Sequence, residues 1–235
     1  MKKFKIKIFA DGADEKQMFY CNKQMLVSGL TTNPSLMKKS GIKNYENFAK
    51  NILKKIKKKN ISFEVFSDDI YEMYNQAKKI NNWGKNIFVK IPVSNSKGKS
   101  TYSLIKKLSA EGVKLNVTAV FTLDQVKNVF KSLSPKTESI ISIFCGRIAD
   151  TGVDPKNIIK KSLKICKKNK KIKILWASTR ELFNIIEAEQ CKCHIITVPK
   201  DILNKIKLIG YDLKKYSKET VKSFYLDAKK SGYKI

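Results

Sequence analysis

The chain has 235 residues, of which 42% are hydrophobic, and this length and composition fit one α/β barrel domain with a substantial core. Its apolar runs are too short to cross a bilayer, which excludes a membrane-spanning protein. The net charge of +29 suggests a nucleic-acid partner, but only two of the 49 basic residues are arginine, the residue on which nucleic-acid readers usually rely.

The N-terminal segment 1–15 begins with lysines, as a signal peptide does. It lacks the apolar stretch and the small-residue cleavage site of such a peptide, and instead becomes a strand that leads into Asp11. We therefore expect a cytoplasmic protein.

Short apolar strands alternate with amphipathic helical patterns along the whole chain. Eight strands are predicted, at residues 5–10, 26–30, 62–66, 86–91, 114–120, 139–144, 171–177 and 193–198. Nearly continuous Val, Ile and Phe in these strands is typical of a parallel sheet covered by helices, and eight such units favour a closed (β/α)8 barrel. An additional C-terminal helix is predicted over residues 217–232. No linker divides the chain, so a single domain over residues 1–235 is expected.

An open, doubly wound sheet is the structural alternative. Such a sheet is expected to carry a glycine-rich phosphate loop after its first strand. The segment FADGADEK (9–16) contains no such loop, which disfavours a nucleotide-binding fold.

The five cysteines have irregular spacing and form no disulfide pattern. The cluster of Cys191, Cys193 and His194 resembles a partial metal site. However, the two cysteines would share one face of a strand while His194 points to the other, and no second ligand pair is present. Buried thiols are the preferred interpretation, and no metal is expected.

Polar residues occur where the strands should be apolar, near their carboxyl ends, which is where barrel enzymes place their catalytic groups. Seven of the eight strands supply at least one, and these residues are Asp11, Thr31, Asn33, Glu64, Lys90, Asn116, Thr118, Ser142 and Ser178. The alternation of side chains along a strand allows each of them to point inward. Together they predict a ring of active-site residues.

Lys90 interrupts the apolar run IFVKIPV, where Phe88 and Lys90 share one face. Burial disfavours the charged form of an amine, and a lysine kept partly neutral in an enclosed site is the usual amine nucleophile toward carbonyl substrates. A structural ion pair with Glu64 or Asp11 is the competing interpretation. The surrounding acid, hydroxyl and amide groups favour chemistry, because imine formation and carbon–carbon cleavage both require proton transfer.

Arg147 and Arg180 directly follow the sixth and seventh strands. In a lysine-dominated chain, guanidinium groups at these two places suggest a clamp for a phosphate, which late loops of a barrel commonly bind. Ordinary surface ion pairs are the alternative.

Five segments carry a more specific pattern: GLTTNPSL (29–36), VKIPV (89–93), NVTAVFT (116–122), SIFCGRIADTG (142–152) and ASTRE (177–181). In this order they resemble the motifs of the transaldolase family, especially its short bacterial branch, from about residue 8 to residue 200. The resemblance implies transfer of a dihydroxyacetone unit from a ketose phosphate to an aldose phosphate, in the non-oxidative pentose phosphate pathway. It also implies a homo-oligomer, with no metal or organic cofactor.

The resemblance further implies that Lys90 forms a Schiff base and that Asp11 is the acid/base for carbon–carbon cleavage. Glu64, through a water held with Thr118, would serve imine formation and hydrolysis. The substrate itself would contact Asn33, Asn116, Ser142, Phe144, Arg147, Ser178 and Arg180.

Two alternatives stay open. A related aldolase, which releases free dihydroxyacetone, resembles a pattern with Gln in place of Glu64 and Tyr in place of Phe144, so transfer is the preferred interpretation. A basic nucleic-acid-binding protein is less favoured, because the lysines are scattered over helices as on solvated faces. Gly12, where the family usually has a hydroxyl residue, and the longer loop 93–100 could change which sugar fits.

Overall fold

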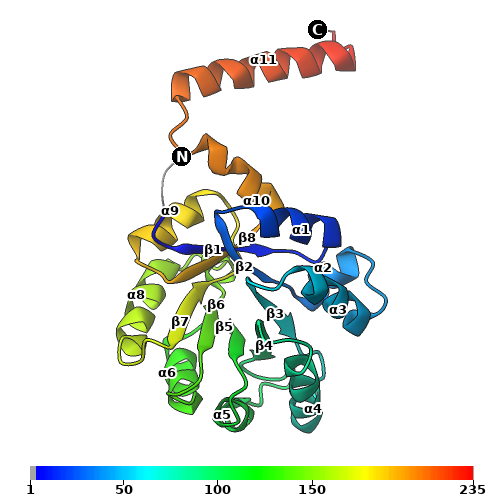
Figure 1. Cartoon of the computed structure of the whole chain (residues 1–235). Helices are drawn as coiled ribbons and strands as arrows, with labels where there is room; N and C mark the ends of the chain where they lie inside the picture. Colours follow the sequence, from blue (N-terminus) through cyan, green and yellow to red (C-terminus); the bar gives the residue numbers. More distant parts are fainter. Residues whose placement is uncertain (1–3, 235) are drawn as a thin grey trace.

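The computed structural model describes residues 4–234 and is a closed barrel of eight parallel strands, each next to its sequence neighbours and β8 next to β1 (Figure 1). The strands are β1 (Lys7–Asp11), β2 (Val27–Thr31), β3 (Asn60–Glu64), β4 (Ile87–Pro92), β5 (Leu115–Val120), β6 (Ser139–Ile143), β7 (Ile172–Trp176) and β8 (Ile195–Pro199). The predicted (β/α)8 barrel is therefore confirmed. The ends of the predicted domain, residues 1–3 and 235, lie outside the described residues.

Helices cover the outside of the barrel (Figure 1). They are α1 (Glu15–Lys23), α2 (Pro34–Lys39), α3 (Tyr45–Lys55), α4 (Ile70–Asn81), α5 (Tyr102–Ala110), α6 (Leu123–Ser132), α7 (Cys145–Ala149), α8 (Pro155–Cys166), α9 (Phe183–Gln190) and α10 (Lys200–Lys205). Several begin at a side-chain cap directly after a strand. Asp14 caps α1, Asn33 caps α2 and Thr122 caps α6 by accepting a hydrogen bond from a backbone N–H of the first turn. These caps fix where each strand-to-helix loop turns back.

The C-terminal helix α11 (Leu213–Ser231) begins four residues before the predicted start at 217. The reason is local, because the Asp212 side chain accepts a hydrogen bond from the Lys215 N–H and caps the helix there. Gly232 ends it in the left-handed conformation that favours glycine. The helix extends away from the barrel (Figure 1), and none of its residues is buried.

Because successive side chains of a strand point to opposite faces, the apolar side chains form two separate clusters, one outside and one inside the barrel. Outward residues such as Ile87, Val89 and Ile91 pack into a large cluster between the strands and the helices. A second, smaller cluster lies inside the barrel and consists of Phe9, Phe88, Ile140, Leu175, Ala177 and Ile195. This inner layer crosses the barrel and separates its carboxyl-terminal end from its amino-terminal end.

One contact in the inner layer requires glycine. A Cβ atom at Gly29 would lie 2.6 Å from the Phe9 ring, well inside van der Waals contact. Any side chain at position 29 would therefore displace Phe9 from the layer.

All five cysteines are free and buried, as predicted. Cys191 caps the C-terminus of α9 rather than sharing a strand face with Cys193, because the chain turns between them before β8 begins. Within residues 4–234, no group of three or more potential metal ligands is found. No helix in the same range is both long and apolar enough to span a bilayer.

Candidate active site

A cavity of about 430 Å³ lies at the carboxyl-terminal ends of the strands. The eleven residues expected at the site all line it, although they come from seven strands and the loops that follow them: Asp11, Asn33, Glu64, Lys90, Asn116, Thr118, Ser142, Phe144, Arg147, Ser178 and Arg180. Barrel closure brings these residues together, as their positions near the strand ends indicated.

Lys90 lies deep in this cavity and is 7% exposed. Its Nζ atom is 2.9 Å from Oε2 of Glu64 and donates a hydrogen bond of 2.8 Å to the carbonyl oxygen of Thr32. The register explains the pairing, because Glu64 on β3 and Lys90 on β4 are directly opposite neighbours. The structural ion pair considered for Lys90 is thus present, and its partner is also the nearest group that can exchange a proton with the amine.

The end of β3 is held in place by an aromatic residue of α3. The hydroxyl of the partly buried Tyr45 donates a hydrogen bond of 2.9 Å to the Glu64 carbonyl oxygen, and its ring packs edge-on against Phe63. Burial raises the pKa of Tyr45, so the phenol stays protonated and keeps donating this bond. Tyr45 therefore fixes the backbone from which the Glu64 carboxylate projects.

Asp11 is held by a chain of hydroxyl groups. Thr31 Oγ1 donates a hydrogen bond of 2.7 Å to Asp11 Oδ1. Thr31 Oγ1 is also in hydrogen-bond contact with Thr197 Oγ1, and Thr197 must be the donor because the single hydroxyl hydrogen of Thr31 is already used. Burial raises the pKa of Asp11, whereas the charge of Lys90 and the bond from Thr31 act in the opposite direction. A carboxyl group with a raised pKa suits a general acid/base.

The opposite wall of the cavity is a second polar chain. Asn116 Nδ2 donates a hydrogen bond of 3.1 Å to Ser62 Oγ, and Ser142 Oγ donates one of 2.6 Å to Asn116 Oδ1. The hydroxyl of Thr118 lies two residues farther along β5, is buried, and has no hydrogen-bond partner among the described residues. A buried hydroxyl of this kind is available to a substrate or a bridging water.

Arg147 lies in α7 and Arg180 lies on the loop after β7, and these two segments contact each other. A Cβ atom at Gly146 would lie only 1.7 Å from the Ser178 carbonyl oxygen, so glycine is required where α7 meets the loop after β7. Arg147 lies over the Phe144 ring, with 5.7 Å between its guanidinium carbon and the ring centroid. Arg180 forms an ion pair with Asp150. Both guanidinium groups thus border the cavity, although Arg180 shares its charge with a carboxylate.

Asn33 has a structural task in addition to the one expected for it. Its Oδ1 atom accepts the 2.9 Å hydrogen bond from the Leu36 N–H that caps α2. The side-chain oxygen is therefore engaged, and the amide nitrogen is the part that could face a substrate.

Thr197 is the main cavity residue that the sequence-based prediction did not include. It is buried on β8 and lines the cavity. The alternation that marked the other strands applies here too, because Thr197 shares the inward face with Ile195. Gly12 and loop 93–100, by contrast, are absent from the residues that line the cavity in the described part of the chain. The loop forms a small hairpin closed by Ser94 and Ser100.

Comparison with known proteins finds one matching family and several similar proteins. The family model described as transaldolase/fructose-6-phosphate aldolase matches residues 8–235. The chain is 34% identical to a probable transaldolase of Nitrosopumilus maritimus (strain SCM1), over 86% of this chain and 87% of that protein. It is 32% identical to a probable transaldolase of Thermoanaerobacter sp. (strain X514), over 98% of this chain and 100% of that protein.

A solved structure shows the same architecture at low sequence identity. The crystal structure of 2,3-dimethylmalate lyase, a PEP mutase/isocitrate lyase superfamily member, superposes with a TM-score of 0.60 at 9% identity. The match covers 97% of this chain and 84% of that one. At this identity the likeness concerns the barrel fold alone.

Proposed function

The chain belongs to the transaldolase/fructose-6-phosphate aldolase family, and from that premise we propose that it transfers a dihydroxyacetone unit from a ketose phosphate to an aldose phosphate through a Schiff base on Lys90. The observation that carries the proposal is the buried Lys90–Glu64 pair with Asp11 in the same cavity. An amine and two carboxylates are the groups that this reaction needs.

In the first step, the Lys90 amine attacks the carbonyl carbon of the ketose phosphate and water leaves, forming an iminium ion. The amine must lose a proton before it attacks, and Glu64 Oε2, at 2.9 Å, can accept it directly. Loss of the carbinolamine hydroxyl then needs a proton, which Glu64 returns. The buried hydroxyl of Thr118 can hold the water that relays this proton.

In the second step, Asp11 removes the proton from the substrate hydroxyl next to the bond that breaks. The electron pair of that bond moves into the iminium group and leaves an enamine on Lys90, while the aldose phosphate departs. An aldose phosphate acceptor then reacts with the enamine in the reverse sense, and Asp11 returns the proton. Hydrolysis of the new imine frees Lys90.

The remaining groups bind the substrate. Asn116 and Ser142 face the cavity as a hydrogen-bonded pair and suit sugar hydroxyls, as does the amide nitrogen of Asn33. Arg147 comes from α7, and Ser178 and Arg180 come from the adjoining loop after β7. All three line the cavity and suit the phosphate. Phe144 supports the Arg147 guanidinium.

The related lyase reaction, release of free dihydroxyacetone, differs only in the fate of the enamine. Glu64 carries a carboxylate and Phe144 lacks a phenolic hydroxyl, and both favour transfer in our assignment. The discriminating assay supplies fructose 6-phosphate with and without erythrose 4-phosphate. Turnover that does not require the acceptor would replace transfer with the lyase reaction.

Borohydride trapping tests the Schiff base itself. Incubation with fructose 6-phosphate and borohydride should reduce the imine to a stable secondary amine, and peptide mass analysis should locate the adduct on Lys90. Lys90→Ala should abolish both adduct and turnover. Lys114→Ala, at the residue directly before the neighbouring strand β5, is the matched control and should retain both. An adduct on another lysine while Lys90 is intact would refute the assignment.

We further propose that the reaction belongs to the non-oxidative pentose phosphate pathway. Charged sugar phosphates do not cross bilayers unaided, which implies a cytoplasmic location.

We also propose a homo-oligomer in which α11 contacts a second copy. The helix exposes large apolar side chains, including Leu213, Val221 and Phe224, which are 64–80% exposed.

A further inference from the structure

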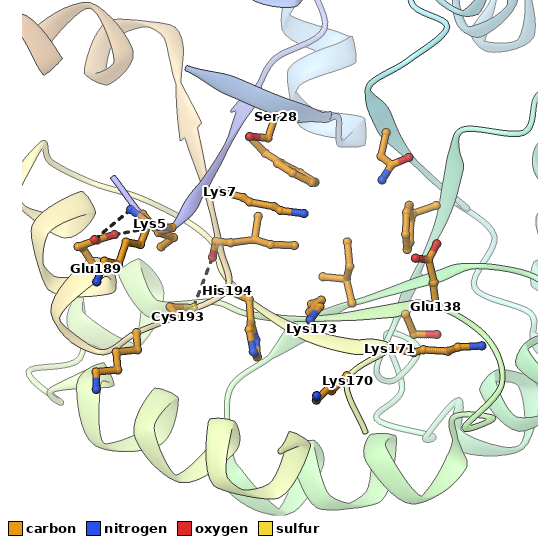
Figure 2. A pocket seen from close by; sticks show the side chains of 18 residues that line it. Lys5, Lys7, Ser28, Glu138, Lys170, Lys171, Lys173, Glu189, Cys193 and His194 are labelled. Atoms are coloured by element: carbon orange, nitrogen blue, oxygen red, sulfur yellow. Dashed lines mark hydrogen bonds between the residues drawn. The ribbon is translucent and has the colours of Figure 1, made fainter. Parts of the chain in front are cut away.

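A second cavity, of about 720 Å³, lies at the opposite end of the barrel, where the strands begin (Figure 2). Six lysines line it: Lys5, Lys7, Lys170, Lys171, Lys173 and Lys192. The Lys7 side chain projects into the cavity from β1, and Lys173 lines the same cavity from β7, two strands away (Figure 2). This end of a barrel usually serves stability rather than binding, so an accumulation of like charge here needs an explanation.

Two carboxylates, Glu138 and Glu189, also line the cavity and offset only part of the charge of its six lysines. Glu189 accepts hydrogen bonds from the backbone N–H groups of Lys5 and Ile6, and Glu138 forms its ion pair with Lys114. Within residues 4–234, none of the six lysines has an ion-pair partner. Ammonium groups that outnumber the carboxylates of a concave site repel one another and attract an anionic ligand.

The floor of the cavity is apolar. It consists of Phe9, Phe88, Ile140 and Ile195, which belong to the inner layer that separates this cavity from the candidate active site. An inorganic ion would use only the lysine rim. A ligand with an aromatic or apolar body would use both the rim and the floor.

The neutral polar residues of the lining include His194 and Ser139. His194 Nδ1 accepts a hydrogen bond of 3.0 Å from the Ile174 N–H, so the neutral imidazole carries its hydrogen on Nε2. Burial, and then the charge of Lys173, lowers the pKa of His194, which keeps the ring neutral. Ser139, 1% exposed, also lines the cavity, and its buried hydroxyl has no hydrogen-bond partner among the described residues. The Nε2–H group of His194 can donate a hydrogen bond to a ligand.

From this combination we propose that the amino-terminal end of the barrel binds an organic phosphate of nucleotide size, with its phosphates on the lysine rim and its base against the apolar floor. The volume is within the range of ligand pockets. Lysine is a common point-charge partner of phosphate. The site is separate from the one that holds Lys90 and does not depend on the reaction proposed there.

The chain contains one histidine, so isotope-labelled histidine gives a single imidazole signal that reports on this cavity. Full-length protein labelled in this way is titrated with ATP, without divalent cations, in about 0.2 M salt to screen non-specific attraction. The expected result is a saturable shift of the His194 signal. Inorganic tripolyphosphate should bind at least about tenfold more weakly, because it cannot use the floor. No shift with ATP, or equal binding of the two anions, would overturn the proposal.

Variants separate this site from general charge attraction. Lys7→Gln with Lys173→Gln should weaken ATP binding by about tenfold or more, the effect of losing charged hydrogen bonds. Lys127→Gln with Lys131→Gln removes the same charge from a different lysine-lined groove on α6 and should leave the affinity unchanged. Equal weakening by both pairs would overturn the proposal.

Two further outcomes would also contradict it. Displacement of ATP by fructose 6-phosphate would assign ATP to the candidate active site. Tighter binding of a single-stranded RNA oligonucleotide than of ATP would make this face a nucleic-acid surface instead. If fructose 6-phosphate fails to bind the protein at all, the His194 titration still decides the matter, so failure of the catalytic proposal is distinguishable.

Discussion

Thr31→Val tests the proton chemistry of the site, because it removes one hydroxyl and changes side-chain volume little. Thr31 Oγ1 donates a 2.7 Å hydrogen bond to Asp11, and this bond opposes the effect of burial on the pKa of the carboxyl. A hydrogen bond to a charged group is worth about 1.5–3 kcal/mol, and one pKa unit corresponds to about 1.4 kcal/mol. Losing the bond should therefore raise the pKa of Asp11 further.

The assay is the pH dependence of kcat/KM for fructose 6-phosphate with erythrose 4-phosphate as acceptor. As a base, Asp11 must be ionised, so activity rises as the pH increases through its pKa. The acid limb of the profile, where kcat/KM rises with pH, should move to higher pH in Thr31→Val. At a fixed pH on this limb, kcat/KM should fall by about tenfold to a hundredfold, while the plateau changes less.

Thr101→Val is the matched control. Its hydroxyl is also buried and donates a 2.6 Å bond, but to the Pro92 carbonyl oxygen. This variant should lose stability without moving the acid limb. An unmoved limb in an active Thr31→Val enzyme, or an equal movement in the control, would show that Asp11 is not the titrating base.

Three further results are expected. Arg180→Ala should raise the KM for fructose 6-phosphate by about tenfold to a hundredfold, as expected for a charged hydrogen bond. Binding of unphosphorylated fructose should be unchanged, and an equal loss for both sugars would contradict the phosphate role. Because the pKa of His194 is lowered in the folded protein, the unfolded chain protonates this imidazole at a higher pH than the folded protein does. The free energy of unfolding of the natural protein should therefore decrease relative to His194→Gln as the pH falls through about 6.5, and the difference should level off below the folded-state pKa. Urea unfolding over a pH series measures this, and parallel curves would contradict it. Removing residues 213–235 should leave Tm nearly unchanged, because α11 buries nothing in the barrel. Light scattering should show a smaller assembly, and an unchanged mass would rule out α11 as the contact between copies.

The sequence determined the fold class and most of the residues that line the candidate active site. Strand and helix are local patterns, and alternation along a strand decides which side chains point inward. Lys90 could be selected because a charged residue inside the apolar run IFVKIPV conflicts with that pattern. Once the strands form a parallel barrel, their carboxyl ends must meet, so polar residues at those ends converge whatever their separation in sequence.

Only the tertiary structure decided which of these residues are partners. Register places Glu64 beside Lys90. Closure brings β8 next to β1, so that Thr197 supports Thr31 and Asp11, although Thr197 and Thr31 are 166 positions apart. The same closure gathers lysines that resemble a solvated surface into one cavity at the other end of the barrel. The physical reason is that a local pattern sets the direction of a side chain, whereas its distance to another depends on register and closure of the whole sheet.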